Sequence, residues 1–171
     1  MELYILRHAI AVEREEWQGS DEGRPLISAG RDKMKEIATG LRLLVPKFDA
    51  ILTSPLVRAW QTAEIVCKVY GIKNSDKLHE TVALSPDSRF DSLFAELRQF
   101  SNDKRVLIIG HQPYLGDLIA YLIADGFARN IPLKKGGAAC LQIDPMAPRS
   151  SGLLQWLLTP KQLRMLVKPN H

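Results

Sequence analysis

The chain has 171 residues, of which 46% are hydrophobic and 25% charged, so it is long enough to bury an ordinary core without disulfides or metals. Its net charge of +4 comes from dispersed basic residues rather than from a basic stripe with interleaved aromatics, which argues against nucleic-acid binding. No apolar run approaches the ~18 residues that a membrane span needs, and no signal peptide is recognisable, so we expect a cytoplasmic protein without membrane association. Two cysteines, Cys67 and Cys140, lie in apolar stretches without metal-ligand spacing and are expected to be buried thiols.

Apolar periodicity and turn residues predict alternating strands and helices. In the first part of the chain, we expect a strand over 1–7, a polar loop over 13–25, and a helix with Ser28 as its N-cap that ends before Pro46. A strand over 50–53 follows, then a helix with Pro55 in its first turn that ends at Gly71, an extended or irregular stretch over 78–84, and a helix over 87–100. The last part contains a strand over 105–109, a helix over 114–123, strands over 138–143 and 152–158, and a closing helix over 160–167 capped by Thr159. This order predicts one α/β domain over 1–171 with a mixed central sheet.

Three of the predicted strands end in residues that suit phosphate chemistry. Arg7 and His8 end the first strand, Ser54 and Arg58 follow the second, and His111 ends the strand over 105–109. If these strands are parallel neighbours, their carboxyl ends open onto one crevice, which is where ligands bind in open α/β sheets. Arginines grip phosphate oxygens in bidentate fashion, and the helix start near Arg58 offers free backbone N–H groups. The sequence therefore predicts a phosphate pocket.

Two imidazoles in such a pocket predict a covalent mechanism. Neutral His8 can attack the phosphorus directly to form a phosphohistidine, while His111 donates to a non-bridging oxygen and stabilises charge in the transition state. Nothing in this scheme needs a metal or a cofactor, because arginines and histidines take the place of Mg²⁺, and no zinc-type or two-metal ligand spacing occurs in the sequence.

These motifs resemble the histidine phosphatase superfamily, also called phosphoglycerate-mutase-like. Arg7-His8-Ala9 matches two of three positions of that family's Arg-His-Gly signature, and Gly110-His111 resembles its second catalytic histidine. Residues 54–63 read Ser-Pro-Leu-Val-Arg-Ala-Trp-Gln-Thr-Ala and are similar to its more specific Ser-Pro-x-x-Arg-Ala-x-Gln-Thr-Ala segment. The resemblance implies a three-layer α/β/α fold with a mostly parallel mixed sheet, His8 as nucleophile, and Arg7, Arg58 and His111 around the phosphate.

Shorter features are similar to the small SixA-type phosphohistidine phosphatases. They are Arg24-Pro25-Leu26, His111-Gln112-Pro113 and the tail over 159–164. The resemblance implies a phosphohistidine-bearing protein, such as a phosphorelay or phosphotransfer domain, as the substrate. Ser54 and Arg24 are expected to help bind it, and Glu80 is the positional match for the family's general acid.

Other interpretations remain open from the sequence. Ala9 replaces the family's glycine, and its methyl group is expected to narrow the pocket beside His8 without closing it. Glu80 is as readily a solvated loop carboxylate as an acid. A phosphatase of small phosphate esters is the alternative among enzymes, whereas a mutase is disfavoured by the short segment between Arg58 and His111. A non-catalytic phosphoprotein-binding module is the alternative outside enzymes.

Overall fold

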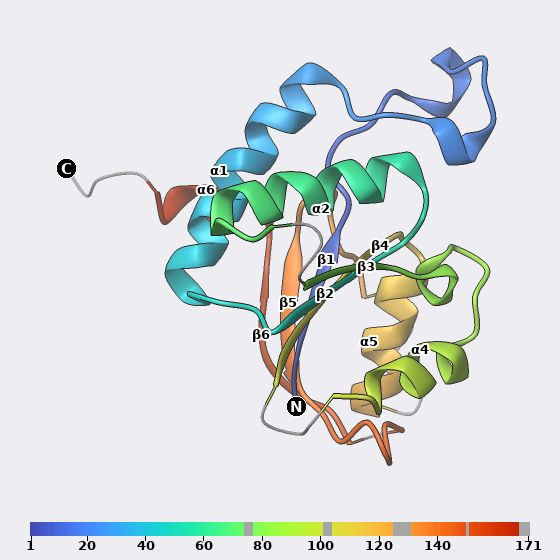
Figure 1. Cartoon of the computed structure of the whole chain (residues 1–171), viewed down its shortest axis with the longest axis vertical. Coiled ribbons are helices and arrows are strands. Elements are labelled where there is room, and N and C mark those ends of the chain that lie inside the picture. The colour runs from blue at the N-terminus through green and yellow to red at the C-terminus, as the bar shows by residue number, and fades with distance from the viewer. Residues whose placement is uncertain (74–76, 101–103, 125–130, 150, 168–171) are drawn as a thin grey trace.

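The computed structural model describes residues 1–73, 77–100, 104–124, 131–149 and 151–167 (Figure 1). A six-stranded sheet with the order β3-β2-β4-β1-β5-β6 forms the centre. Its strands are β1 (Glu2–Arg7), β2 (Ala50–Thr53), β3 (Leu78–Glu80), β4 (Arg105–Gly110), β5 (Ala138–Gln142) and β6 (Leu153–Leu158). The pairs β1–β4, β2–β4 and β2–β3 are parallel, and β5 is antiparallel to both β1 and β6. This is the predicted mostly parallel mixed sheet.

Helices cover both faces of the sheet. Figure 1 shows α1 (Ser28–Leu44), α2 (Val57–Tyr70) and α6 (Pro160–Met165) on one side, and α4 (Phe90–Leu97) and α5 (Tyr114–Ala124) on the other. The two faces follow from the alternation of side chains along the strands. In β1, Tyr4 and Leu6 pack with the first set of helices, while Leu3 and Ile5 pack with the second. The predicted three-layer α/β/α architecture is confirmed.

The helix starts differ from the prediction where tertiary contacts set them. Ser28 is not the N-cap of α1 but its first helical residue, and Ile27 is at the N-cap position. The Ile27 N–H donates to the Ile10 carbonyl (3.1 Å), which holds the backbone extended up to Ile27. Pro55 lies before α2, whose N-cap position is Leu56. The predicted cap of α6 is confirmed: Thr159 and Gln162 form a reciprocal capping box.

The helix expected over 87–100 is shorter than predicted. It spans only Phe90–Leu97, because the chain before it is held in a turn in which the Ser88 N–H donates to the Ser85 carbonyl (3.1 Å). The stretch over 78–84 contains β3 and a short 3₁₀ helix, η3 (Val82–Leu84). The polar loop over 13–25 contains two more, η1 (Arg14–Glu16) and η2 (Asp21–Gly23). No helix in the described part of the chain is both long and apolar enough to cross a membrane.

Candidate active site

The carboxyl ends of three adjacent parallel strands lie side by side. Arg7 of β1 is in register with Gly110 of β4, and Thr53 of β2 with Ile109, so the residues that follow these strands emerge at the same edge. There the rings of His8 and His111 lie 5.2 Å apart between centroids, and both are almost fully buried. The predicted convergence of the three strand ends is therefore present in the fold.

A cleft of about 330 Å³ opens at this edge. Residues of the loop over 13–25 line it together with His111 and Gln112, which follow β4, and Lys135, which precedes β5. Its lining residues are Arg7, His8, Glu13, Arg14, Glu15, Asp21, Arg24, Arg58, Pro86, His111, Gln112 and Lys135. The strong excess of charged and imidazole side chains suits a polar ligand rather than an apolar one.

His8 is held as a neutral imidazole with one fixed tautomer. Its Nδ1 lies 2.7 Å from the Ala9 carbonyl oxygen, and since a carbonyl only accepts, the proton sits on Nδ1. Burial, with the nearby His111 second, lowers the pKa of His8 from 6.5 to about 2. Nε2 therefore keeps its lone pair at any physiological pH, which is the state a nucleophile requires.

His111 is oriented by a serine behind it. Its Nε2 lies 2.8 Å from Ser54 Oγ, and the same oxygen accepts from the Leu56 N–H (3.3 Å). The hydroxyl can accept from Leu56 and still donate its own proton to Nε2, and in that arrangement the proton of the neutral ring is on Nδ1. Burial, followed by Arg58, lowers the pKa of His111 to about 3, so this ring is also neutral. Ser54 is fully buried and does not line the cleft, so it reaches a ligand only through His111.

The two arginines are anchored so that one side of each remains unused. Arg7 Nη1 donates to the Leu133 carbonyl (2.9 Å), while Arg58 donates from Nη1 to the Asp21 carbonyl (2.7 Å) and from Nη2 to Asp21 Oδ2 (2.8 Å). Burial lowers the pKa of both guanidinium groups, but they remain cations at neutral pH. Such fixed cations need no reorganisation when an anion arrives.

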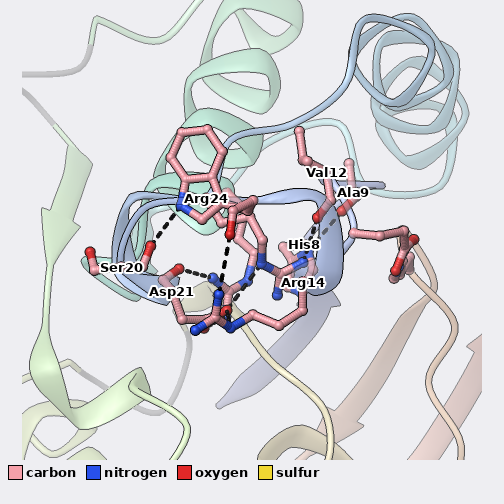
Figure 2. A network of polar contacts seen from close by, with 11 residues as sticks. His8, Ala9, Val12, Arg14, Ser20, Asp21 and Arg24 are labelled. Carbon is pink, nitrogen blue, oxygen red and sulfur yellow. Dashed lines mark hydrogen bonds and ion pairs between the residues drawn. The ribbon is translucent and has the colours of Figure 1, made fainter.

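Asp21 organises the loop over 13–25 beside the cleft, a role that was not predicted from the sequence. Its carboxylate pairs with Arg58 and with Arg24 Nε (3.0 Å), while Arg24 Nη1 donates to the Val12 carbonyl (2.7 Å). Burial alone would raise the pKa of the Asp21 carboxyl, but Arg58 and Arg24 outweigh it and hold this pKa below its usual value. Figure 2 shows Asp21, Arg24, Arg14 and Ser20 gathered around this loop, with His8 close by. The only available signal was the spacing of Asp21 three residues before Arg24.

Two residues of the 54–63 segment fasten the loops around His8. Thr62 Oγ1 donates to the Arg58 carbonyl (2.7 Å) and accepts from the Ala9 N–H (3.0 Å). Gln61 Oε1 accepts from the Leu26 N–H (2.9 Å) at the entrance to α1. In the 54–63 segment, therefore, Thr62 and Gln61 hold neighbouring loops in place, while Arg58 lines the cleft.

Unpartnered polar atoms are concentrated in the cleft. Within the described residues, four buried side-chain nitrogen or oxygen atoms have no hydrogen-bond partner: Arg7 Nε, Arg58 Nε, His111 Nδ1 and Gln112 Oε1. All four belong to residues that line the cleft. The first three are donors, and an unpaired buried donor costs about 1–3 kcal/mol. An oxyanion in the cleft would bring oxygen acceptors next to the residues that carry these donors.

Glu80 lies apart from this arrangement. It is exposed at the end of β3 and is not among the residues that line the cleft. Its role as general acid stays a prediction. Ala9, expected to narrow the space beside His8, lines a neighbouring pocket and not the cleft. In the part of the chain that the structure describes, no group of three or more His, Cys, Asp or Glu side chains is placed to hold a metal ion.

Comparisons with known proteins agree with this geometry. The family model of the histidine phosphatase superfamily (branch 1) matches residues 3–83, which include His8 and Arg58. An uncharacterized protein of Picosynechococcus sp. is 34% identical over 139 residues, covering 80% of this chain and 82% of its own length. The phosphohistidine phosphatase SixA of Escherichia coli is 27% identical over 167 residues, covering 96% and 98% of the two chains.

The fold comparison points the same way. The solved structure of the protein histidine phosphatase SixA complexed with tungstate superposes with a TM-score of 0.80 at 26% identity, covering 95% of this chain and 99% of that one. The fold is a mostly parallel α/β/α sandwich with two buried histidines at adjacent strand ends, and its relatives include histidine phosphatases. The chain belongs to the histidine phosphatase superfamily.

Proposed function

We propose that this protein is a metal-independent phosphatase that removes phosphate from phosphohistidine in a protein partner, through a covalent intermediate on His8. The observation that carries the proposal is the set of three buried, unpartnered donors on Arg7, Arg58 and His111 beside a neutral imidazole. Together they form a receptor for a phosphoryl group with a nucleophile next to it.

The first step transfers the phosphoryl group to His8. The Nε2 lone pair of His8 attacks the phosphorus and forms a new N–P bond, while the bond from phosphorus to the substrate imidazole breaks. The leaving imidazole carries away the electron pair of that bond, as a neutral ring if its other nitrogen was protonated. Arg7, Arg58 and His111 donate to the phosphoryl oxygens and stabilise the charge that builds on them in the transition state.

The second step returns His8 to its starting state. A water molecule attacks the phosphorus of phospho-His8, the N–P bond breaks with its electron pair returning to Nε2, and both water protons leave on the product as dihydrogen phosphate. The Nδ1–H of His8 donates to the Ala9 carbonyl throughout, so the ring accepts and releases the phosphoryl group at Nε2 alone.

A phosphohistidine substrate fits a site in which Glu80, the positional match for the general acid, lies outside the cleft. A protonated imidazole leaves more readily than an alkoxide, so the P–N bond can be broken with little help from an acid. Asp21 lines the cleft, but its lowered pKa keeps it ionised, and Glu80 is exposed outside the lining. The similarity to SixA supports a phosphohistidine-bearing protein as the substrate, and we propose that this protein is a phosphorelay or phosphotransfer domain.

The test compares wild type with His8→Ala on a histidine-phosphorylated phosphotransfer domain and on an aryl phosphate, with EDTA present. We expect release of phosphate from the domain by wild type and none by the variant. His79→Ala, which removes an exposed histidine on β3, is the matched control and should keep full activity. Turnover of the aryl phosphate alone would move the substrate class to small esters. Binding of the phosphorylated domain without turnover would favour a non-catalytic module.

A further inference from the structure

A second, smaller pocket adjoins the cleft. Its volume is about 170 Å³, and it is lined by Ala9, Ile10, Gly30, Lys33, Ile37, Lys135, Pro160, Lys161 and Arg164. Lys135 lines both this pocket and the cleft, and Ala9 directly follows His8 in the chain. The pocket therefore lies beside the place where the phosphoryl group would bind.

The floor of this pocket is apolar and built by close backbone packing. Ala9 and Ile37 are buried, and Ile10 is half-buried. A Cβ on Gly30 would collide with the Ile10 carbonyl, and a Cβ on Gly136 would come within 2.7 Å of Ile37 Cδ1. Because Gly136 also has φ +79°, this approach depends on glycine. The floor is thus a fixed surface rather than a gap between mobile side chains.

The rim of this pocket is basic. Lys33 and Lys161 are exposed, and within the described residues neither has an ion-pair partner. Lys135 pairs with Glu13 (3.1 Å), and Arg164 pairs with Glu36 (2.7 Å), so four cations face two carboxylates. The excess positive charge around an apolar floor favours a ligand that is both acidic and aliphatic.

We propose that this pocket is a recognition subsite for the phosphohistidine-bearing protein, and that it binds an aliphatic side chain flanked by acidic residues. The pocket is well below the ~300 Å³ of sites that enclose whole small molecules, so one side chain of a larger partner fits it better than a free metabolite does. Lys33 and Lys161 face the flanking carboxylates, and Lys135 connects the subsite to the cleft. This inference rests on the proposed function, because it names a feature of the same substrate.

The test uses synthetic phosphohistidine peptides. One series carries a leucine between two glutamates at about two to six residues from the phosphohistidine, a reach of roughly 7–20 Å for extended chain. The matched series carries glutamine in place of each glutamate and serine in place of leucine. For the best spacing we expect kcat/KM to favour the acidic, aliphatic peptide about tenfold, mainly through KM. The preference should shrink as salt rises from ~0.05 M to ~0.5 M, because screening weakens the charge contacts.

Reversing the charge of the two exposed lysines tests whether they cause the preference for the acidic, aliphatic peptide. In Lys33→Glu/Lys161→Glu the tenfold preference should vanish, while kcat/KM for the neutral peptide stays within about twofold of wild type. Lys47→Glu/Lys104→Glu has the same change of net charge but lies at the opposite edge of the sheet, beside Met1 and Gln142, and should keep the preference. A wild type that cleaves both series equally, or a preference that survives the first double variant, would overturn the subsite and leave the phosphatase intact. Failure to cleave either series would count against the proposed function instead.

Discussion

The two buried histidines should make the protein sensitive to mild acid. Burial lowers the pKa of His8 to about 2 and that of His111 to about 3, whereas both titrate near 6.5 in the unfolded chain. Below pH 6.5 these two histidines therefore become protonated in the unfolded chain, whereas they stay neutral in the folded protein. Where the unfolded state binds more protons, stability rises with pH, so the free energy of unfolding must drop as the pH is lowered from 6.5 toward the folded pKa values.

The size of this loss follows from the two pKa values of each ring. Between pH 7.5 and pH 5.0, one histidine with an unfolded pKa of about 6.5 and a folded pKa below about 4 costs about 2 kcal/mol, and two cost about 4 kcal/mol. This free-energy loss hardly depends on the folded pKa, because the ring in the folded protein is still almost wholly neutral at pH 5.0. Carboxylates remain largely ionised at pH 5.0, so most of the change comes from the imidazoles.

Urea unfolding of wild type and His8→Asn at both pH values measures this loss. The variant lacks one of the two rings, so it should lose about 2 kcal/mol less than wild type over this interval, whatever its stability at pH 7.5. His79→Asn removes an exposed histidine and should follow wild type. If wild type and His8→Asn lose the same free energy, His8 is not a buried neutral imidazole and the nucleophile argument built on it fails.

Three further predictions concern single side chains. Ser54→Ala removes the partner of His111 Nε2, so kcat for a phosphohistidine protein should fall about 5–150-fold with little change in KM, as steady-state kinetics would show. Asp21→Ala frees both Nη atoms of Arg58, so KM and the inhibition constant of inorganic phosphate should rise together, by about tenfold; a change in kcat alone would contradict this positioning role. Gly40→Ala places a Cβ against the Leu163 carbonyl where α1 meets α6, so the free energy of unfolding in urea should fall by about 1–3 kcal/mol. Thr39→Ala, on the same helix at a half-exposed position, should change it by less than ~1 kcal/mol, and equal effects of the two variants would refute the close packing.

The strands of the sheet and the edge that carries the site were predictable, because apolar runs mark strands and parallel strands share one carboxyl edge. His8 and His111 directly follow β1 and β4, so their neighbourhood follows from topology alone. Helix starts were less predictable, because a backbone bond from Ile27 to Ile10, far from any capping signal, decides where α1 begins.

Side-chain partnerships in the loops could not be predicted from spacing. Asp21 lies in a polar loop with several acidic neighbours, and only the folded loop shows which carboxylate meets Arg58. Ser54 was predicted to help bind the substrate, and spacing alone did not indicate that its hydroxyl contacts His111. Ala9 shows the same limit: its position in the chain is next to His8, yet it lines a different pocket.

The placement of the site on β1, β2 and β4 has a consequence during protein synthesis. These strands are central in the sheet, and β4 lies between the other two although it is the last of them to leave the ribosome. Until residue 111 has emerged, His8 and Arg58 have neither the second imidazole nor the strand that aligns them. A nascent chain therefore holds no competent phosphate site for most of its synthesis, and appearance of activity during translation would report the moment at which the middle of the sheet closes.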